Sequence, residues 1–369
     1  MRALDPDLEV LYVGSGHALE QKLLRESDID YIAIPSGKYR RYHRSLIRAA
    51  LDVRTNTRNV RDILKVNAGY LRARRVIHQF KPDVIFVTGG YVGLPIGLAA
   101  QHLHIPIVLH EANAVSGLTN RLLGKYARII ATAFPVANYA DFDATKLVFV
   151  GNPIREDILQ ANQTQAETFF AFSKQKPNIL IFGGSHGAQI LNDLVFDNLQ
   201  WLVKHYNVIH VAGEQGIEQA RFLAHQLDRD LQDSYRPYDF LRRELGLGFV
   251  LADLVICRSG ANTVAELAAW HKPAILIPFK SAANNEQFEN AQVLVKAGAA
   301  RMLSEDKLSG RRLISEIDRL MESPKDRDYL QGNIEKFYKP DSAELLAKQI
   351  LQIAKREGKT KHGKATEKR

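Results

Sequence analysis

The chain has one cysteine, three methionines, two tryptophans and no long uninterrupted apolar run among its 369 residues. The single cysteine, Cys257, cannot form an intrachain disulfide, which fits a reducing compartment and excludes a disulfide-stapled secreted domain. The longest apolar region, residues 85–109, is interrupted by Gly, Pro, Gln and His, so it predicts strand, turn, helix and strand rather than a membrane span. Residues 1–7 lack the apolar core of a signal peptide. We therefore expect a cytoplasmic protein. With one cysteine there is also no Cys/His cluster, so neither a metal nor a cofactor is predicted.

Positive charge is concentrated in two segments. The formal net charge is +9, and residues 38–81 contain 13 Lys/Arg against 2 Asp/Glu, while residues 355–369 contain 7 against 2. The rest of the chain is therefore net negative. Localised basic charge suits anionic lipids, diphosphates or nucleic acids. We expect no nucleic-acid partner, because aromatic residues do not alternate with the basic residues through the segment as a stacking surface requires.

The basic segment 38–81 also has the pattern of an amphipathic helix. Four apolar residues fall near one helical face and four basic residues fall on the neighbouring face: Val60, Ile63, Leu64 and Leu71, then Arg58, Arg61, Lys65 and Arg72. A basic amphipathic helix can lie on a membrane surface. The same pattern also suits a helix that turns its apolar stripe to the core and its basic side to solvent. The pattern alone leaves both alternatives open.

Short apolar runs alternate with helical patterns along the chain, which predicts doubly wound parallel sheets. The predicted strands are Val10–Val13, Tyr31–Ile34, Val84–Val87, Ile105–Leu109, Ile129–Ala131, Val148–Val150, Ile179–Phe182, Val208–Val211, Leu254–Cys257, Ala274–Ile277 and Ala300–Leu303. Two such series indicate two Rossmann-like domains. We place an N-terminal domain at 1–153, a C-terminal domain at 154–340, a helix at 341–356 and a disordered basic tail at 357–369.

The most informative stretch is Ala252 to Glu266. The apolar run Leu254–Cys257 ends in a Ser-Gly turn that opens into a predicted helix. Ligands of α/β sheets bind at such strand ends, where the free N–H groups of a helix N-terminus can hold an anion. A carboxylate one turn into the helix, Glu266, can accept hydrogen bonds from ribose hydroxyls, so we predict a nucleotide-sugar pocket. The alternative is that Thr263 and Glu266 only form a capping box.

Further turns follow other predicted strands. The glycine-rich turns at 88–93 and 183–188 suit diphosphate groups, although each alone can also serve packing. The His110-Glu-Ala-Asn stretch ends another strand, and His110 is a weak candidate for a catalytic residue. Arg155 lies near the predicted domain boundary, from which it can reach a diphosphate or form a hinge salt bridge.

Taken together, five motifs in order resemble the MurG family of N-acetylglucosaminyltransferases over nearly the whole chain. They are Thr88-Gly-Gly-Tyr-Val-Gly, His110-Glu-Ala-Asn-Ala-Val-Ser-Gly-Leu-Thr-Asn, Gly151-Asn-Pro-Ile-Arg, Gly183-Gly-Ser-His-Gly-Ala and Cys257-Arg-Ser-Gly-Ala-Asn-Thr-Val-Ala-Glu. The resemblance implies a GT-B fold, in which two Rossmann-like domains face each other across a cleft. It also implies metal-independent, inverting transfer of GlcNAc from UDP-GlcNAc to lipid I, undecaprenyl-diphosphoryl-MurNAc-pentapeptide, giving lipid II in peptidoglycan synthesis. The expected location is peripheral, on the cytoplasmic face of the inner membrane, with the basic segment 38–81 on anionic lipids.

The resemblance also assigns residues to the substrates. The implied donor contacts are Asn113, Arg155, Ser185, Leu241, Ala261, Asn262, Thr263, Val264, Ala265, Glu266 and Gln287. Glu266 would bind the ribose, and the backbone at Leu241 would meet the uracil. The loop that contains Thr88, Gly89, Gly90 and Tyr91 would bind the acceptor diphosphate.

The start of the chain departs from the family pattern. The family begins with a strand, a Gly-Gly-Thr-Gly-Gly-His turn and a helix, whereas here Asp7 to Gly14 resembles the family's second strand. The family's proposed base histidine lies in the piece that is missing, so the catalytic base is unassigned, and a central sheet position is expected to be empty. A misplaced start codon, which we favour, a fragment and a defective copy would each explain this.

Two further readings stay open. One is a catalytically defective protein that still binds UDP-GlcNAc. The other is a related UDP-sugar 2-epimerase, or a transferase with a diacylglycerol acceptor.

Overall fold

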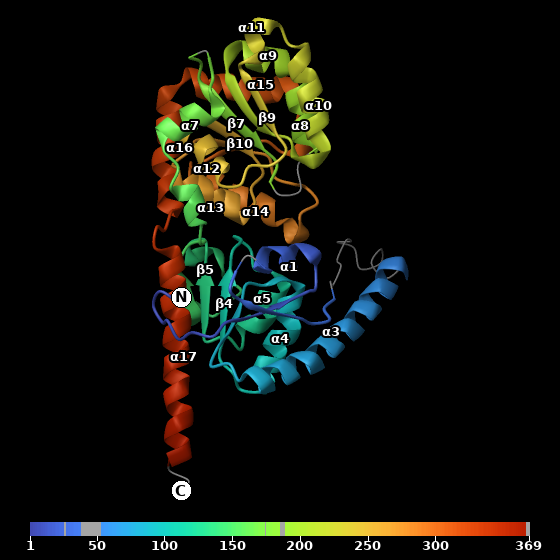
Figure 1. Cartoon of the computed structure of the whole chain (residues 1–369), viewed down its shortest axis with the longest axis vertical. Coiled ribbons are helices and arrows are strands. Elements are labelled where there is room, and N and C mark those ends of the chain that lie inside the picture. Colours follow the sequence, from blue (N-terminus) through green and yellow to red (C-terminus); the bar gives the residue numbers. More distant parts are fainter. Residues whose placement is uncertain (26, 38–52, 174, 185–188, 367–369) are drawn as a thin grey trace. The chain divides into compact units, whose positions relative to one another are not determined.

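The computed structural model describes residues 1–25, 27–37, 53–173, 175–184 and 189–366 (Figure 1). Its contacts divide the chain into two compact units. The N-terminal unit contains residues 1–112, 116–150 and 343–369, and the C-terminal unit contains residues 113–115 and 151–342. The chain therefore crosses between the units more than once.

The C-terminal unit has one sheet of six parallel strands in the order β12-β11-β10-β7-β8-β9. Its strands are β7 (Asn178–Phe182), β8 (Asn207–Val211), β9 (Tyr235–Tyr238), β10 (Leu254–Cys257), β11 (Ala274–Leu276) and β12 (Arg301–Met302). Read along the chain, the order runs outward from β7 in both directions, so the topological switch point lies between β7 and β10. Ligands of doubly wound sheets bind beyond the carboxyl ends of the strands at this point.

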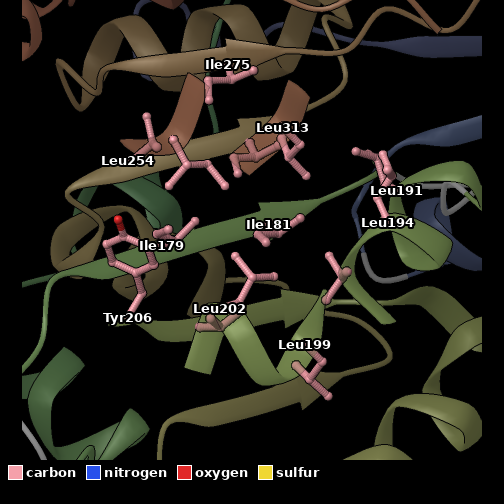
Figure 2. Packing of buried hydrophobic residues seen from close by; sticks show 14 of the residues in the cluster. Ile179, Ile181, Leu191, Leu194, Leu199, Leu202, Tyr206, Leu254, Ile275 and Leu313 are labelled. Carbon is pink, nitrogen blue, oxygen red and sulfur yellow. The ribbon is translucent and has the colours of Figure 1, made fainter. Parts of the chain in front are cut away.

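The core of this unit forms because β7, β8 and β10 are mostly apolar, apart from Asn178, Asn207 and His210, and are covered by amphipathic helices. Ile179 and Ile181 of β7 pack with Leu254 of β10 and with leucines from the covering helices (Figure 2). The helices of the unit are α6 (Glu156–Leu159), α7 (Gln163–Phe170), α8 (Gln189–Asp197), α9 (Leu199–His205), α10 (Gly213–Gln226), α11 (Arg229–Gln232), α12 (Glu244–Leu251), α13 (Ala261–Ala269), α14 (Glu286–Lys296), α15 (Gly310–Glu322) and α16 (Pro324–Ile334), with short 3-10 turns η3 (Ala283–Asn285), η4 (Glu305–Lys307) and η5 (Glu335–Phe337).

One strand of this sheet, β9, was not predicted from the sequence. It contains Pro237, which cannot donate a hydrogen bond to a ladder, and β8 is its single neighbour among the described strands. Proline is tolerated in a strand at the edge of a sheet, where one side of the backbone needs no partner. Pro237 argued against a strand in the sequence, and the position at the sheet edge allows one.

The N-terminal unit has parallel strands in two separate sheets, β1-β2 and β3-β4-β5-β6. The strands are β1 (Leu11–Gly14), β2 (Asp30–Ala33), β3 (Ile85–Val87), β4 (Ile107–Glu111), β5 (Ile129–Thr132) and β6 (Leu147–Phe149). The sequence predicted an empty central position in this domain. Among the described residues no strand joins β1 to β3, and each of these two strands has one unpaired edge.

The helices of the N-terminal unit are α1 (Ala18–Arg25), α3 (Val53–Phe80), α4 (Gly90–His102), α5 (Leu118–Gly124) and α17 (Ser342–Thr366), with 3-10 turns η1 (Val136–Asn138) and η2 (Ala144–Lys146). Although α17 is last in the sequence, it belongs to this unit and lies beside its sheet (Figure 1), where three of its apolar residues pack against β4, β5 and the residue after β6. These residues are Leu346, Ile350 and Ile353, and they contact Val108, Ala131 and Val150. The helix runs to Thr366, beyond the end at 356 that the sequence predicted, because Lys, Glu and Ala are good helix formers.

The predicted amphipathic stripe on α3 faces solvent. Val60 and Leu64 are 60% and 63% exposed, and Ile63 and Leu71 are also exposed. The helix instead buries Ala73, Val76 and Ile77, which lie on a different face. The alternative of a core-facing apolar stripe is therefore wrong, because the residues packed against α4 come from that other face. In the described part of the chain, no helix combines the length and apolar character of a membrane span.

Candidate functional site

A cavity of about 1030 Å³ opens in the C-terminal unit at the switch point, beyond the ends of β7 and β10. It is lined by Asn113, Arg155, Phe182, Gly183, Gly184, Gln189, Ile190, Val211, Phe240, Leu241, Leu245, Arg258, Gly260, Ala261, Asn262, Thr263, Glu266, Phe279, Glu286, Gln287 and Glu305. Its volume lies at the upper end of what small-molecule sites usually have. Hereafter we call it the switch-point cavity.

The N-terminus of α13 lines this cavity without a side-chain cap. The helix begins at Ala261, its N-cap is Gly260, and among the described residues no side chain caps its first N–H groups. Thr263 and Glu266 are too far into the helix to act as N-cap and N3, so the capping-box alternative is wrong. The unsatisfied N–H groups and the helix dipole together favour an anionic ligand at this end.

Glu266 is one and a half turns into α13 and also lines the cavity. Burial raises the pKa of Glu266 to about 7, although the positive charge of Arg155 acts in the opposite direction. A carboxyl group in such surroundings gains from any ligand that donates hydrogen bonds to its ionised form. It is therefore suited to bind a pair of hydroxyl groups.

Arg155 supplies the positive charge at the same cavity. One of its guanidinium nitrogens, Nη2, donates to the carbonyl oxygen of Arg242 at 3.2 Å, and Nε lies 3.8 Å from a carboxylate oxygen of Asp157. Both contacts are on a side chain that is half exposed, so they hold the guanidinium only loosely. Its remaining N–H groups can turn to an anion at the start of α13.

The buried residue Asn290 of α14 fixes residues 113–115 to the C-terminal unit. Its Nδ2 donates to Asn113 Oδ1 at 3.1 Å and to the carbonyl oxygen of Ser259 at 3.0 Å. Its Oδ1 accepts from the backbone N–H of Ala114 at 2.7 Å. This side chain therefore links the turn after β10 to the segment that brings Asn113 to the cavity.

Gln287, also on α14, has a hydrogen-bond partner at its side-chain oxygen. Its Oε1 accepts from the backbone N–H of Phe279 at 2.9 Å, and its carbonyl oxygen accepts from Ser259 Oγ at 2.7 Å. Glu286, the adjacent residue, accepts from Asn113 Nδ2 at 3.5 Å. Both residues line the cavity, although the sequence favoured only Gln287 as a ligand contact.

Sequence reasoning missed an ion pair in the wall of the cavity. The buried Arg258 donates through Nη1 to Glu305 at 2.5 Å and to the carbonyl oxygen of Ile277 at 2.9 Å, and its guanidinium lies 5.3 Å from the ring centre of Phe279. Arg258 was within a quoted motif but had no assigned role. Glu305 belongs to none of the motifs, because it comes from the loop after β12, which only the fold brings to this place.

The structure gathers eight of the eleven predicted donor residues in this one cavity. They are Asn113, Arg155, Leu241, Ala261, Asn262, Thr263, Glu266 and Gln287. Val264 and Ala265 are not in its lining, because they are on other faces of α13 and Val264 is buried in the core. Ser185 lies outside the described residues.

The glycine-rich loop 88–91 belongs to the N-terminal unit. Gly89 and Gly90 have φ angles of 89° and 70°, which only glycine adopts without strain, and Gly89 is the N-cap of α4. Thr119 Oγ1 donates to the carbonyl oxygen of Gly90 at 2.7 Å. Thr88 and Gly90 are exposed, and Tyr91 is half-buried.

His110 does not line the switch-point cavity. It lies within β4 with its side chain 4% exposed, in the interior of the N-terminal unit. Its carbonyl oxygen accepts from Asn120 Nδ2, which also donates to the buried carboxylate of Glu111. The surroundings are those of a buried strand residue, so its proposed catalytic role gains no support from its position.

Two family models match the chain. The model for the glycosyltransferase family 28 N-terminal domain matches residues 2–132, and the model for the C-terminal domain of the same family matches residues 178–350. Together they cover most of the chain.

Relatives and solved structures are similar over most of the chain. A UDP-N-acetylglucosamine--N-acetylmuramyl-(pentapeptide) pyrophosphoryl-undecaprenol N-acetylglucosamine transferase of Shouchella clausii is 34% identical over 86% of this chain and 84% of its own. The protein of the same name from Clostridium botulinum is 32% identical over 87% and 86%. The crystal structure of Acinetobacter baumannii MurG has a TM-score of 0.71 and 26% identity, and the match covers 95% of this chain and 93% of that one.

Proposed function

Because this chain belongs to glycosyltransferase family 28, in both its N-terminal and its C-terminal domain, we propose that it transfers GlcNAc from UDP-GlcNAc to lipid I. Lipid I is the N-acetylmuramyl-(pentapeptide) pyrophosphoryl-undecaprenol that the relatives' name contains. The chain is a UDP-GlcNAc glycosyltransferase of the GT-B fold, and its product, lipid II, is used in peptidoglycan synthesis.

The observation that carries this proposal is the composition of the switch-point cavity. It combines the uncapped start of α13, the guanidinium of Arg155 and the buried carboxyl group of Glu266. These are the groups that a nucleoside diphosphate sugar needs, namely N–H donors and positive charge for the diphosphate and a hydrogen-bond acceptor for the ribose.

We assign the parts of the donor accordingly. Glu266 accepts hydrogen bonds from the ribose hydroxyls, and the backbone of Leu241 meets the uracil edge. Leu241 is buried and no hydrogen bond of its backbone is formed among the described residues, so its N–H and C=O are available for a base. The first turn of α13, Ala261 to Thr263, and Arg155 hold the diphosphate. Asn113 and Gln287 then lie toward the sugar.

In this arrangement the acceptor hydroxyl attacks the anomeric carbon of GlcNAc in line with the departing UDP. The bond to the diphosphate oxygen breaks, and the charge that develops on UDP is stabilised by the N–H groups of α13 and by Arg155. The exposed loop Thr88 to Tyr91 binds the acceptor diphosphate through backbone N–H groups at the start of α4. The catalytic base is unassigned.

The test is transfer of labelled GlcNAc to a lipid I analogue, with UDP binding measured in parallel by calorimetry. We expect both turnover and UDP binding. Glu266→Ala should raise the KM for UDP-GlcNAc by at least about tenfold, the value of one to two lost hydrogen bonds to a charged group. Glu167→Ala, an exposed glutamate on α7, is the control and should change neither constant. UDP binding without any turnover would instead indicate a catalytically defective UDP-binding protein.

We further propose that the enzyme acts at the cytoplasmic face of the cell membrane and binds anionic lipids through α3. The exposed apolar residues Val60, Ile63 and Leu64 lie beside the exposed basic residues Arg61 and Lys65. Apolar side chains that enter the lipid interface and cations that meet lipid phosphates together suit a peripheral helix.

Flotation with phosphatidylglycerol-containing vesicles tests this proposal. Leu64→Asn should weaken vesicle binding by about tenfold, because it removes about 1–2 kcal/mol of apolar burial. Phe222→Asn, which alters an equally exposed apolar residue of the other unit, is the matched control. Equal binding to purely zwitterionic vesicles, or equal loss in both variants, would contradict the proposal.

A further inference from the structure

A second cavity, of about 510 Å³, lies along the outer edge of the C-terminal sheet. It is lined by residues 300–303 of the β12 region and by parts of α14, α15 and α16. Among the described residues, none that lines this cavity also lines the switch-point cavity. The two sites are therefore separate, and the proposed reaction does not use this one.

The backbone of β12 has a free edge beside this cavity. Of the strands that the structure describes, β12 pairs with β11 alone, and Leu303 donates its N–H to the carbonyl oxygen of Leu276. Backbone groups of successive residues in a strand point to opposite sides, so the N–H and C=O of Met302 point away from β11. Neither group has a hydrogen-bond partner among the described residues.

Three arginines line the same cavity. Arg301 is tightly paired, since its Nε donates to Glu316 at 2.6 Å, and Arg319 lies at 3.9 Å from a carboxylate oxygen of Asp326. Arg312 differs from both, because its Nη1 donates only to the carbonyl oxygen of Lys307, at 3.1 Å. Within the described part of the chain its guanidinium has no carboxylate partner. The positive charge that is left in the cavity is therefore that of Arg312.

The rim of the cavity is apolar and exposed. Tyr329 of α16 is 63% exposed, and Val295 of α14 is 37% exposed. The ring of Tyr329 lies directly over Gly298. A Cβ atom added to Gly298 would lie 2.7 Å from the hydroxyl oxygen of Tyr329. An exposed aromatic ring beside an open strand edge is suited to pack against the side chain of an added strand.

From these features we propose that the β12 edge binds an extended, acidic segment of a partner polypeptide. The segment adds as a seventh strand, and its backbone pairs with the N–H and C=O of Met302. One of its carboxylates meets Arg312 while an apolar side chain packs on Tyr329. A small anion fits less well, because it can use the N–H of Met302 but not the C=O.

The proposal can be tested with a fluorescent nine-residue peptide in which Glu and Val alternate, and with the same peptide carrying Lys in place of Glu. Fluorescence anisotropy with the full-length protein should show binding of the Glu peptide at least about tenfold tighter than that of the Lys peptide. Hydrogen exchange of the Met302 amide should slow when the Glu peptide is present.

Three variants separate the contacts. Arg312→Glu and Met302→Pro should each weaken binding of the Glu peptide about tenfold, the first through charge and the second through the lost N–H at a strand edge. Arg311→Glu changes the adjacent exposed arginine, which does not line the cavity, and should alter binding less than about twofold. GlcNAc transfer should be unchanged in all three, which also reports that they fold.

Several outcomes would overturn the proposal. They are equal binding of both peptides, equal loss in the Arg311 and Arg312 variants, and unchanged exchange of the Met302 amide. Binding of inorganic phosphate or a nucleotide at this site without peptide binding would identify an anion site instead. Concentration-dependent dimers that Met302→Pro abolishes would identify a second copy of the chain as the occupant.

Discussion

At the scale of single residues, Glu266 and Arg155 have opposite electrostatic effects at one cavity. Burial makes the ionised form of the carboxyl group unfavourable, and the guanidinium charge makes it favourable. In the ligand-free protein burial has the larger effect, and the pKa of Glu266 rises to about 7. Hydroxyl donors from a bound ribose would favour the ionised form and lower this pKa, so donor binding is coupled to release of a proton.

This coupling predicts that donor affinity depends on pH. Below pH 7 the carboxyl group is mostly protonated and must ionise to accept two hydroxyl donors, so the Kd for UDP-GlcNAc should rise about fivefold between pH 7 and pH 6. In Glu266→Gln the Kd should be higher at pH 8 and nearly independent of pH. Calorimetry across this range is the measurement. A wild-type Kd that is flat from pH 6 to 8 would show that Glu266 does not meet the ribose as an anion.

The raised pKa of Glu266 also affects folding stability. Stability should fall as the pH rises, whereas donor affinity should increase. The folded pKa of about 7 lies above the ordinary value of 4.5, so the folded state binds more protons than the unfolded chain between these values. The contribution of Glu266 to the unfolding free energy is therefore largest below pH 4.5 and is lost as the pH rises toward 7. Urea denaturation of the ligand-free protein at pH 5.5 and 7.5 should show a smaller difference in Glu266→Gln than in the wild type.

Asn290 gives a second prediction at the residue scale. Replacement by alanine removes three hydrogen bonds, two of them fully buried, and leaves the backbone groups of Ala114 and Ser259 without this partner. Asn290→Ala should lower the unfolding free energy by about 2–4 kcal/mol and raise the KM for UDP-GlcNAc, because Asn113 is no longer held at the cavity. Chemical denaturation and donor titration measure the two effects. A destabilised protein with an unchanged KM would argue against a role of Asn113 in donor binding.

At the scale of elements, α13 has a helix start that is left uncapped at some cost in stability. Its N-cap is Gly260, where serine, threonine, aspartate and asparagine are the stabilising residues. A Cβ atom at this position would find its nearest neighbour 3.9 Å away, in Thr263, so the space for a capping side chain exists. Since no described side chain caps this helix start, its first N–H groups can bind the anionic ligand that we propose.

Gly260→Asp should therefore separate stability from donor binding. The new carboxylate would cap α13 and raise the unfolding free energy by about 0.5–1 kcal/mol, while its negative charge would raise the KM for UDP-GlcNAc at least about tenfold. Ser309→Asp at the N-cap of α15, whose serine already caps that helix, is the control and should leave the KM unchanged. Unaltered donor affinity in Gly260→Asp would mean that the diphosphate is not at the start of α13.

At the scale of the whole molecule, the end of the chain stabilises the unit that contains its beginning. Ile350 of α17 is buried against β4 and β5, so Ile350→Ala should lower the stability of the N-terminal unit by about 2–4 kcal/mol. Hydrogen exchange should quicken in β4 and β5 but not in β7 and β10, and the Kd for UDP should be unchanged. Gln352→Ala, an exposed position on the same helix, is the control. Faster exchange in β7 and β10 would show that α17 supports the other unit.

The sequence by itself determined the fold class and most of the strands, and it predicted residues that line the switch-point cavity. Continuous apolar runs such as Ile179 to Phe182 are typical of buried parallel strands, and the turns after them mark the strand ends at which ligands bind. A local sequence pattern was sufficient to predict an element wherever neighbouring residues alone determine its conformation. It failed for β9, where Pro237 is acceptable only because the strand is at a sheet edge. It also left the capping box open as an alternative, which the observed helix start excludes because Gly260 is the N-cap.

Only the tertiary structure decided which distant residues meet. It brought Glu305 to Arg258, Asn290 to the 113–115 segment, and α17 to the first unit, because burial and hydrogen bonding between such residues depend on the path of the whole chain. It also decided that the apolar stripe of α3 faces solvent. The periodicity of a sequence predicts that a helix has an apolar face. Which face of the helix is buried depends on the surface that packs against it.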